Sequence, residues 1–460
     1  MTRRLAVATL LLLEPASACT TFVVGRAATS DGSVLASHSN DGDGGTAGNL
    51  AVVRAADWKL PAQTHGGVPQ VAHTHAYYTK AGGYASVNEF QVGLAESTCV
   101  AAFPANRSAG ARLNIVDLSA LGLERATSAR TAVAVMGELA ERYGYADNGE
   151  SLLVYDPQEA FVFHVLPDDT GASAVWVAER VPDDSVAVVA NSFTVRTVEF
   201  DDYGGGGGGS AHHGRFLSSS NMRAVALRSG RWAEGAPLDF TWVFGGREPG
   251  HKYASGRRMW RALHLLAPAA AAAARLEPTY DEYVSSRPYP ATLGPAINLT
   301  VADLRAAMRD YYQGTAYDLS AGLAAGPFGS PLRLGVAANG SAGADGEEGG
   351  WERPIAVSRT IVSYVVVCRG WLAPEVGGVL WFGMHSALTT VYVPWPLALL
   401  RTATGTNATG GAPIIMAPVV PPVALPVAYT NNSAGRADRG VGAWQAARFV
   451  FTAAQLHFTA

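Results

Sequence analysis

Residues 19–44 read CTTFVVGRAATSDGSVLASHSNDGDG, and this stretch gives the clearest indication of the fold. Thr20 to Val24 is rich in β-branched and aromatic residues, which favour strands. Ser30-Asp31-Gly32 has the composition of a turn, and an apolar pattern resumes at Val34-Leu35. We therefore predict two short strands joined by a turn, with Cys19 immediately before the first strand.

The rest of the chain contains blocks of predicted strands and blocks of predicted helices. The helix expected over Ala129 to Tyr143 ends at Gly144, and a capping box from Thr300 to Asp303 opens another that runs through Tyr312 to Gly314. Because the pattern is not a regular βαβ repeat, we expect an α+β fold. Further expected elements are strands at Val92 to Ala102, Leu152 to Val165, Val186 to Ala190, Ile361 to Val367 and Gly378 to Phe382, and a helix at Met259 to Leu266.

Residues 1–18 differ in character from the rest and are predicted to be a signal peptide. Two arginines precede an apolar run from Leu5 to Leu13, and Ala16-Ser17-Ala18 matches a signal-peptidase site. The apolar run is much shorter than the roughly twenty residues of a membrane-spanning helix, so we expect no stable membrane span. Cleavage after Ala18 would make Cys19 the first residue of the mature protein.

Asn-x-Ser/Thr sequons are compatible with passage through a secretory pathway, and we expect a secreted protein or one of a lysosome-like or vacuole-like lumen. The sequons lie at Asn106, Asn298, Asn339, Asn407 and Asn431. A bacterial lipoprotein signal is the competing interpretation, because a cysteine directly follows the cleavage pattern. Such signals normally have an aliphatic residue three positions before the cysteine, where this chain has Ala16.

The composition excludes some classes of function. The chain has 460 residues, of which 48% are hydrophobic and 16% charged, and this is ample for a large core. A formal net charge of -4 offers no basic face for a phosphate backbone, so nucleic-acid binding is not expected. The three cysteines, Cys19, Cys99 and Cys368, define no disulfide framework. The sequence has no HExxH or CxxC pattern, so no metal or cofactor is expected.

An N-terminal cysteine would carry its own base. A free α-amine has a pKa near 8 and a free thiol one near 8.5, so both change protonation near neutral pH. Because the two groups share one residue, the amine lies within direct or one-water reach of the sulfur and can act as general base. The alternative is a separate histidine base, for which His38 is the nearest candidate in sequence; His164 and the His212-His213 pair are others.

Sequence blocks along the chain, together with the opening at Cys19, resemble the dipeptidase A family of N-terminal-nucleophile (Ntn) cysteine peptidases, to which the secernins are related. That family opens on Cys-Thr-Thr with a strand, an Asp-Gly-Ser turn and a second strand ending in Arg/Lys-Asn-x-Asp. The blocks appear in the family's order and cover most of residues 19–395. They are VNEFQVGLAEST (87–98), GESLLVYDPQEAFVFHVLP (149–167), SAVWVAERVPDDSVAVVANSFTVR (173–196), GHKYASGRRMWRA (250–262), YQGTAYDLSAGLAAGPFG (312–329), ERPIAVSRTIVSYV (352–365) and EVGGVLWFG (375–383).

The resemblance implies a four-layer αββα sandwich with two antiparallel sheets between helical layers. It also implies hydrolysis of dipeptides through a thioester formed on Cys19. Residues 19–400 would form the peptidase domain, and residues 401–460 a Pro/Gly-rich loop and a helical segment packed on it. Two alternatives stay open: an Ntn acylase that cleaves non-peptide amides, and a non-catalytic lipid-anchored binding protein.

The resemblance also implies roles for individual residues. Asp41 falls on the family's second-strand Asp, which in related Ntn hydrolases holds the nucleophile's amino group. Asn191 matches a position where a side-chain amide serves the oxyanion hole. Arg359 matches an arginine that in related acylases lies near the cysteine sulfur. Without the resemblance, these residues are interpreted as a turn Asp, a strand-ending Asn and a surface Arg.

Two further features concern charge. Where the family has Arg or Lys, three residues before the Asp, this chain has His38. Because an ordinary histidine is mostly neutral above pH 6.5, a permanent cation near the sulfur is not expected from that position. The arginines at 257, 258 and 261 are predicted to form a solvated helix face. The glycine run Gly204–Gly209 and the segments 337–350 and 402–434 are predicted to be loops.

Overall fold

The computed structural model describes residues 19–42, 49–80, 83–198, 215–246, 252–278, 289–322, 325, 329–331, 352–402 and 414–416. The predicted signal peptide, the glycine run, segment 337–350, the His212-His213 pair and most of segment 402–434 lie outside these residues.

The first sheet contains Cys19's own strand at its centre. Within the described residues it has seven strands, all paired antiparallel, in the order β16-β12-β1-β2-β17-β18-β19. Their bounds are β1 Thr20–Val24, β2 Val34–Asp41, β12 Val186–Val189, β16 Thr292–Leu293, β17 Thr360–Cys368, β18 Val379–Met384 and β19 Val393–Pro396. Every residue of β1, β2 and β17 is buried, as expected for strands covered on both faces.

The second sheet has nine strands within the described residues, in the order β14-β11-β10-β9-β8-β7-β6-β3-β20. Their bounds are β3 Leu50–Val53, β6 Tyr77–Lys80, β7 Ala85–Asn88, β8 Gly93–Cys99, β9 Gly149–Tyr155, β10 Ala160–Pro167, β11 Ala174–Val181, β14 Phe216–Ser218 and β20 Ile414–Met416. Two short pairs lie outside both sheets: β4 (Ala56–Asp57) with β5 (His73–Thr74), and β13 (Thr197–Val198) with β15 (Leu238–Asp239).

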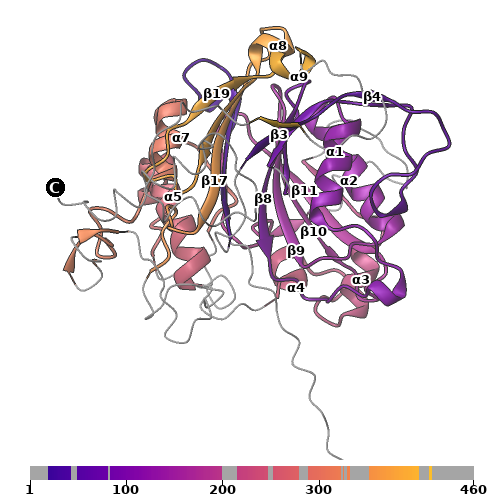
Figure 1. Ribbon diagram of the computed structural model, residues 1–460. Helices are drawn as coiled ribbons and strands as arrows, with labels where there is room; N and C mark the ends of the chain where they lie inside the picture. The colour runs from indigo at the N-terminus through magenta and orange to yellow at the C-terminus, as the bar shows by residue number, and fades with distance from the viewer. Residues whose placement is uncertain are drawn as a thin grey trace, which may run out of the picture.

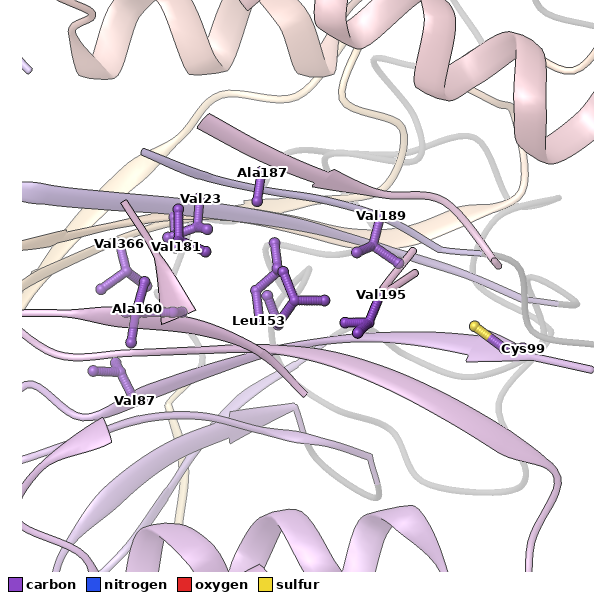
Figure 2. Close-up of a cluster of buried hydrophobic side chains, with 14 of the residues drawn as sticks. Val23, Val87, Cys99, Leu153, Ala160, Val181, Ala187, Val189, Val195 and Val366 are labelled. Atoms are coloured by element: carbon purple, nitrogen blue, oxygen red, sulfur yellow. The ribbon is translucent and has the colours of Figure 1, made fainter. Parts of the chain in front are cut away.

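The two sheets face each other (Figure 1), and a single buried apolar cluster contains residues of both. Figure 2 shows Val23, Ala187 and Val189 of the first sheet lying opposite Leu153 of the second. Valine and alanine predominate among the residues labelled there. The sheets therefore hold the ends of their strands at fixed positions relative to each other.

Helices cover the outer face of each sheet (Figure 1). Helices α1 (Ile115–Arg125) and α2 (Ala129–Tyr143) share one buried cluster with the second sheet, and α5 (Arg257–Leu266) and α7 (Val301–Met308) share another with the first. The remaining helices are α3 Met222–Arg228, α4 Phe240–Phe244, α6 Pro268–Ala273, α8 Pro374–Gly377 and α9 Ala398–Thr402, and a π-helical turn at Lys252–Gly256 leads into α5. No helix of the described ranges has the length and apolar character needed to cross a membrane.

The expected α+β class is confirmed, and several elements agree closely with the sequence patterns. Strand β1 has its predicted bounds, and α2 ends where predicted, with Gly144 in the positive-φ conformation at 74°. The capping box at Thr300 is present, but α7 ends at Met308 rather than near Tyr312. Arg309 already leaves the helical conformation there, so the predicted extension is wrong.

Candidate active site

Cys19 lies at the end of β1, between the two neighbouring strands of the first sheet. It is fully buried. Thr21 pairs with Val189 on one side and Thr20 pairs with Ser39 on the other, so the next positions bring Asn191 and Asn40 beside Cys19. The amide nitrogen Nδ2 of Asn40 is 4.0 Å from the Cys19 sulfur. The sheet register thus gathers residues from three separate stretches of sequence around one thiol.

Asn191 occupies a strained position two residues after the end of β12. Its φ of 55° lies in the left-handed region, which asparagine tolerates better than most residues. Its side-chain Nδ2 donates to the Thr98 carbonyl at 2.7 Å, and its backbone N–H donates to Ser97 Oγ at 2.8 Å. Ser97 Oγ in turn donates to the Cys19 carbonyl at 3.3 Å. These contacts fix the orientation of the Asn191 amide next to Cys19.

Asp41 ends β2 and is completely buried. Its carboxylate accepts from Arg353 Nη2 at 2.7 Å and from Thr360 Oγ1 at 2.6 Å, with Ser39 Oγ at 3.4 Å. Arg353 is also buried, at 2% side-chain exposure, so this is a desolvated ion pair with supporting hydrogen bonds. The predicted site residue Asp41 therefore has a rigid environment built from β2 and from the start of β17.

Two buried arginines contact these residues, and neither is the arginine that the sequence suggested. Arg258 of α5 donates to the Cys19 carbonyl and to Thr20 Oγ1, both at 2.8 Å, and to Asn191 Oδ1 at 2.7 Å. Arg353 Nη1 also reaches Asn191 Oδ1, at 3.3 Å. We call Arg258 and Arg353, with Asp41 and Asn191, the arginine side of the site.

The prediction of a solvated arginine face on α5 is wrong. Arg258 and Arg257 are 0% and 2% exposed. Arg257 pairs with Glu352 and lies over the Tyr317 ring at 3.8 Å. Arg359, the predicted site arginine, is only half-buried, and its carbonyl accepts from the Gly42 N–H at 3.2 Å. The error arose because α5 is amphipathic with its arginines turned inward, which periodicity cannot distinguish from outward-facing charge.

Carboxyl groups lie on the other side of the thiol. Glu96 of β8 is 2% exposed, and its Oε2 atom is 3.4 Å from the Cys19 sulfur. The same oxygen is 3.4 Å from Nε2 of His38, but neither ring nitrogen of His38 has hydrogen-bond geometry to any described residue. Glu150 of β9 is 1% exposed. We call Glu96, Glu150 and His38 the carboxylate side of the site.

These surroundings oppose ionisation of the thiol. Burial first, and then the charges of Glu96 and Asp41, raise the pKa of Cys19 well above its usual range, although a backbone hydrogen bond from Asp41 lowers it. A thiol in this environment stays protonated at neutral pH. Nucleophilic attack therefore needs a base that removes the proton as the new bond forms.

The two candidate histidine bases that the structure describes, His38 and His164, lie in different parts of the fold. His38 reaches the cluster around Cys19, as its proximity in sequence suggested. His164 does not: it is fully buried in β10, its Nδ1 is 2.7 Å from Ser151 Oγ, and its Nε2 accepts from the N–H groups of Thr194 and Val195. His164 thus supports the segment that follows Asn191 and offers no free nitrogen to the thiol.

Cys19, His38 and Glu96 are the set of described side chains that could together hold a metal ion. One ligand atom of each lies within 4.8 Å of the others, and all three are buried. Sulfur, imidazole and carboxylate ligands suit Zn²⁺. A metal bound there would occupy the sulfur itself, so it would compete with attack by Cys19 on a carbonyl.

A buried cysteine flanked by carboxylates, ordered amides and guanidinium groups is an arrangement suited to hydrolysis by a nucleophilic thiol. The chain belongs to Peptidase family C69, which it matches over residues 18–410. It is therefore a peptidase, and the family resemblance noted from its motifs is confirmed.

Curated relatives of the chain share about a quarter of its residues. It is 25% identical to a "Probable dipeptidase" of Salmonella dublin over 413 residues, covering 84% of this chain and 82% of that protein. It is 23% identical to a "Probable dipeptidase A" of Streptococcus pyogenes serotype M18 over 403 residues, covering 82% and 74%. A "Probable dipeptidase" of Latilactobacillus sakei matches at 24% over 278 residues, covering 60% and 49%.

Four residues of this site were not selected as site residues by sequence reasoning: Arg258, Arg353, Glu96 and Glu150. A signal for Glu96 exists, because a single charge in the apolar pattern GLAESTC is costly to bury unless the residue is used. Arg353 carries no comparable signal. Its neighbours in sequence do not reveal that it points at a carboxylate contributed by β2.

Proposed function

We propose that this protein is a dipeptidase of the Ntn-hydrolase class, with Cys19 as the N-terminal nucleophile. The observation that carries the proposal is the position of Cys19, buried at the end of a central strand with Asp41 and Asn191 contributed by the two flanking strands. The names of the curated relatives support peptide substrates of two residues. Two facing antiparallel sheets with helices outside them are compatible with the αββα sandwich of that class.

In this proposal, cleavage before Cys19 converts its peptide nitrogen into a free α-amine. The amine takes the thiol proton while the Sγ–C bond to the substrate carbonyl forms. The proton then passes to the leaving nitrogen as the C–N bond breaks, which leaves a thioester and releases the second amino acid. Water adds to the thioester, again with the amine as base, and the Sγ–C bond breaks to restore the thiol.

The surrounding residues position these groups. The Asp41 carboxylate, held by Arg353 and Thr360, orients the amine and raises its basicity. The Asn191 amide stabilises the oxyanion, and its contact with the Thr98 carbonyl holds the side chain in place for this role. Arg258 supports both partners by holding the Cys19 carbonyl and Asn191 Oδ1.

The proposal also includes secretion. Residues 1–18 act as a signal peptide, so export and activation are a single cleavage event. Mass spectrometry of the mature protein tests this part. An unmodified Cys19 at the N-terminus supports it, whereas a lipid adduct or a retained leader contradicts it.

The catalytic part is tested with a panel of dipeptides and acyl-amino acids. We expect the mature wild-type protein to hydrolyse dipeptides, and Cys19→Ala to lose at least about 10⁴-fold in kcat. Cys19→Ser keeps a hydroxyl and should retain at most a trace of activity. Cys99→Ala is the matched control, because Cys99 is also buried but belongs to the inter-sheet core. Full turnover by Cys19→Ala would refute the mechanism.

A further inference from the structure

The carboxylate side of the site contains a negative charge that the protein leaves incompletely compensated. Glu96 Oε1 accepts from Thr98 Oγ1 at 2.9 Å, and Oε2 faces the Cys19 sulfur. The ion pairs of the described residues include no arginine or lysine within 4 Å of Glu96; Lys80 is the nearby cation that Glu96 influences at longer range. The site's two arginines are directed to other acceptors.

Glu150 adds a second carboxyl group to the same cluster. Burial first, and then the charge of Glu96, raise the pKa of Glu150 well above its usual range. Glu150 therefore keeps its proton at neutral pH, so it adds no second negative charge beside the Glu96 carboxylate. A protonated carboxyl can also donate a hydrogen bond, so Glu150 helps to hold that charge in place.

Other buried polar groups nearby have no hydrogen-bond partner among the described residues. Both ring nitrogens of His38 and the hydroxyl of Tyr145 are in this state, at 2% and 0% exposure. His38 Nε2 lies 3.4 Å from Glu96 Oε2, and Tyr145 lies near enough to Glu150 for the two groups to interact electrostatically. Buried polar groups normally find partners, so this cluster has the character of a cradle for a polar, cationic ligand.

Because this cluster lies next to the Cys19 sulfur, its position identifies which cationic group of a substrate could bind there. In a dipeptide the α-ammonium nitrogen is about 2.5 Å from the carbonyl carbon that is attacked, from the N–Cα and Cα–C bond lengths. The sulfur approaches that carbon at about 3–3.5 Å before reaction. Because Glu96 Oε2 is 3.4 Å from the sulfur, an ammonium at the usual charge-assisted distance of about 2.8 Å from it satisfies all of these separations.

We propose that Glu96 binds the α-ammonium group of the substrate's first residue, so that the enzyme cleaves only the peptide bond next to a free amino terminus. This inference rests on the proposed dipeptidase function and names the group that restricts it. Glu96 is thus a specificity residue: it aligns the first carbonyl with Cys19 and rejects peptides whose amino terminus is blocked or neutral.

The test compares alanyl-alanine with lactoyl-alanine, in which a hydroxyl replaces the ammonium without added bulk. We expect wild-type kcat/KM to favour alanyl-alanine by about 10²-fold or more. Glu96→Gln should lose that preference, mainly through a higher KM for alanyl-alanine, and should leave lactoyl-alanine almost unchanged. Glu179→Gln is the matched control, because Glu179 of β11 is also a buried glutamate of the second sheet but pairs with Arg215, and it should keep the preference.

Each contrary result has a distinct meaning. Equal wild-type rates on the two substrates overturn the inference but leave the dipeptidase proposal intact, whereas no hydrolysis of any dipeptide overturns the dipeptidase proposal. Equal losses on both substrates in Glu96→Gln would mean that Glu96 acts on the thiol instead. Loss of activity in a chelator, restored by Zn²⁺, would assign Glu96 to a metal.

A second measurement needs no variant and so does not depend on the folding of Glu96→Gln. L-Alaninol carries the ammonium but no scissile bond, and 1,2-propanediol carries a hydroxyl in its place. We expect alaninol to inhibit wild-type hydrolysis of alanyl-alanine competitively and propanediol to have no effect at the same concentration. Equal inhibition by the two compounds, or none by either, overturns the inference.

Discussion

On one side of Cys19 lie the guanidinium groups of Arg258 and Arg353, and on the other lie the carboxyl groups of Glu96 and Glu150. The arginines are directed to protein acceptors: a backbone carbonyl, Asn191 Oδ1 and the Asp41 carboxylate. Glu96 has no arginine or lysine partner among the ion pairs of the described residues; it accepts from Thr98 Oγ1 and the Cys19 thiol and lies beside the Glu150 carboxyl.

From this difference we distinguish buried charged groups that stabilise the protein from a buried charged group that is available to bind a ligand. A buried ion pair with complete hydrogen bonds fixes geometry, and breaking it is costly. A buried carboxylate without an arginine or lysine counterion is retained only where it has a use, because its desolvation is otherwise unfavourable. Variants of the arginine side should therefore affect stability, and variants of the carboxylate side should affect substrate selection.

The largest stability effect is expected for Arg353→Met. The substitution leaves Asp41 buried without its cation, which should lower the free energy of unfolding by about 3–5 kcal/mol and abolish most activity. Urea denaturation of the two proteins measures the difference. Arg359→Met, six residues along the same segment and half-buried, is the control and should cost at most about 1 kcal/mol. Equal losses in the two variants would contradict the importance of the Asp41 contact.

A smaller effect is expected for Arg258→Lys. Lysine keeps the charge but cannot reproduce the fork that reaches the Cys19 carbonyl, Thr20 Oγ1 and Asn191 together, so we expect a loss of about 2 kcal/mol. We also expect kcat to fall about tenfold or more, because Asn191 loses a partner. Arg261→Lys on the same helix affects the Asp310 pair instead and should leave kcat unchanged. Thermal melting and steady-state kinetics separate the two outcomes.

The third prediction concerns pH and the support of the Asn191 segment. Burial lowers the pKa of His164 from 6.5 to about 3, so the folded chain holds this side chain neutral. Between those values the unfolded chain binds a proton that the folded chain does not, and stability is therefore lost as the pH falls. His164 alone should reduce the free energy of unfolding by about 2 kcal/mol between pH 7 and pH 5.

The measurement is denaturant unfolding of wild type and His164→Gln at both pH values. The glutamine oxygen can still accept from the N–H groups of Thr194 and Val195 but does not titrate, so the variant should have the shallower pH dependence. His73→Gln, a change at an exposed histidine, should keep the wild-type slope. A slope in His164→Gln as steep as in wild type would show that other groups cause the acid sensitivity.

The sequence predicted local structure well where a local pattern determines it. The β-branched run of β1, the stop at Gly144 and the capping box at Thr300 each depend on residues within one turn or strand. The helix from Thr300 was predicted too long, because its end depends on contacts outside that pattern. Asp41 and Asn191 were selected only through the family resemblance, since each has an ordinary local interpretation.

By itself, the sequence determined that Cys19 directly follows a cleavage pattern and directly precedes a buried strand. It also determined that the chain is a peptidase of family C69. The tertiary structure decided which charges surround that cysteine. Arg258, Arg353 and Glu96 come from α5, the segment before β17 and the second sheet, and only the packing of those elements brings them together. Charge acts through space at a few ångströms, and sequence distance carries no information about which charges will meet.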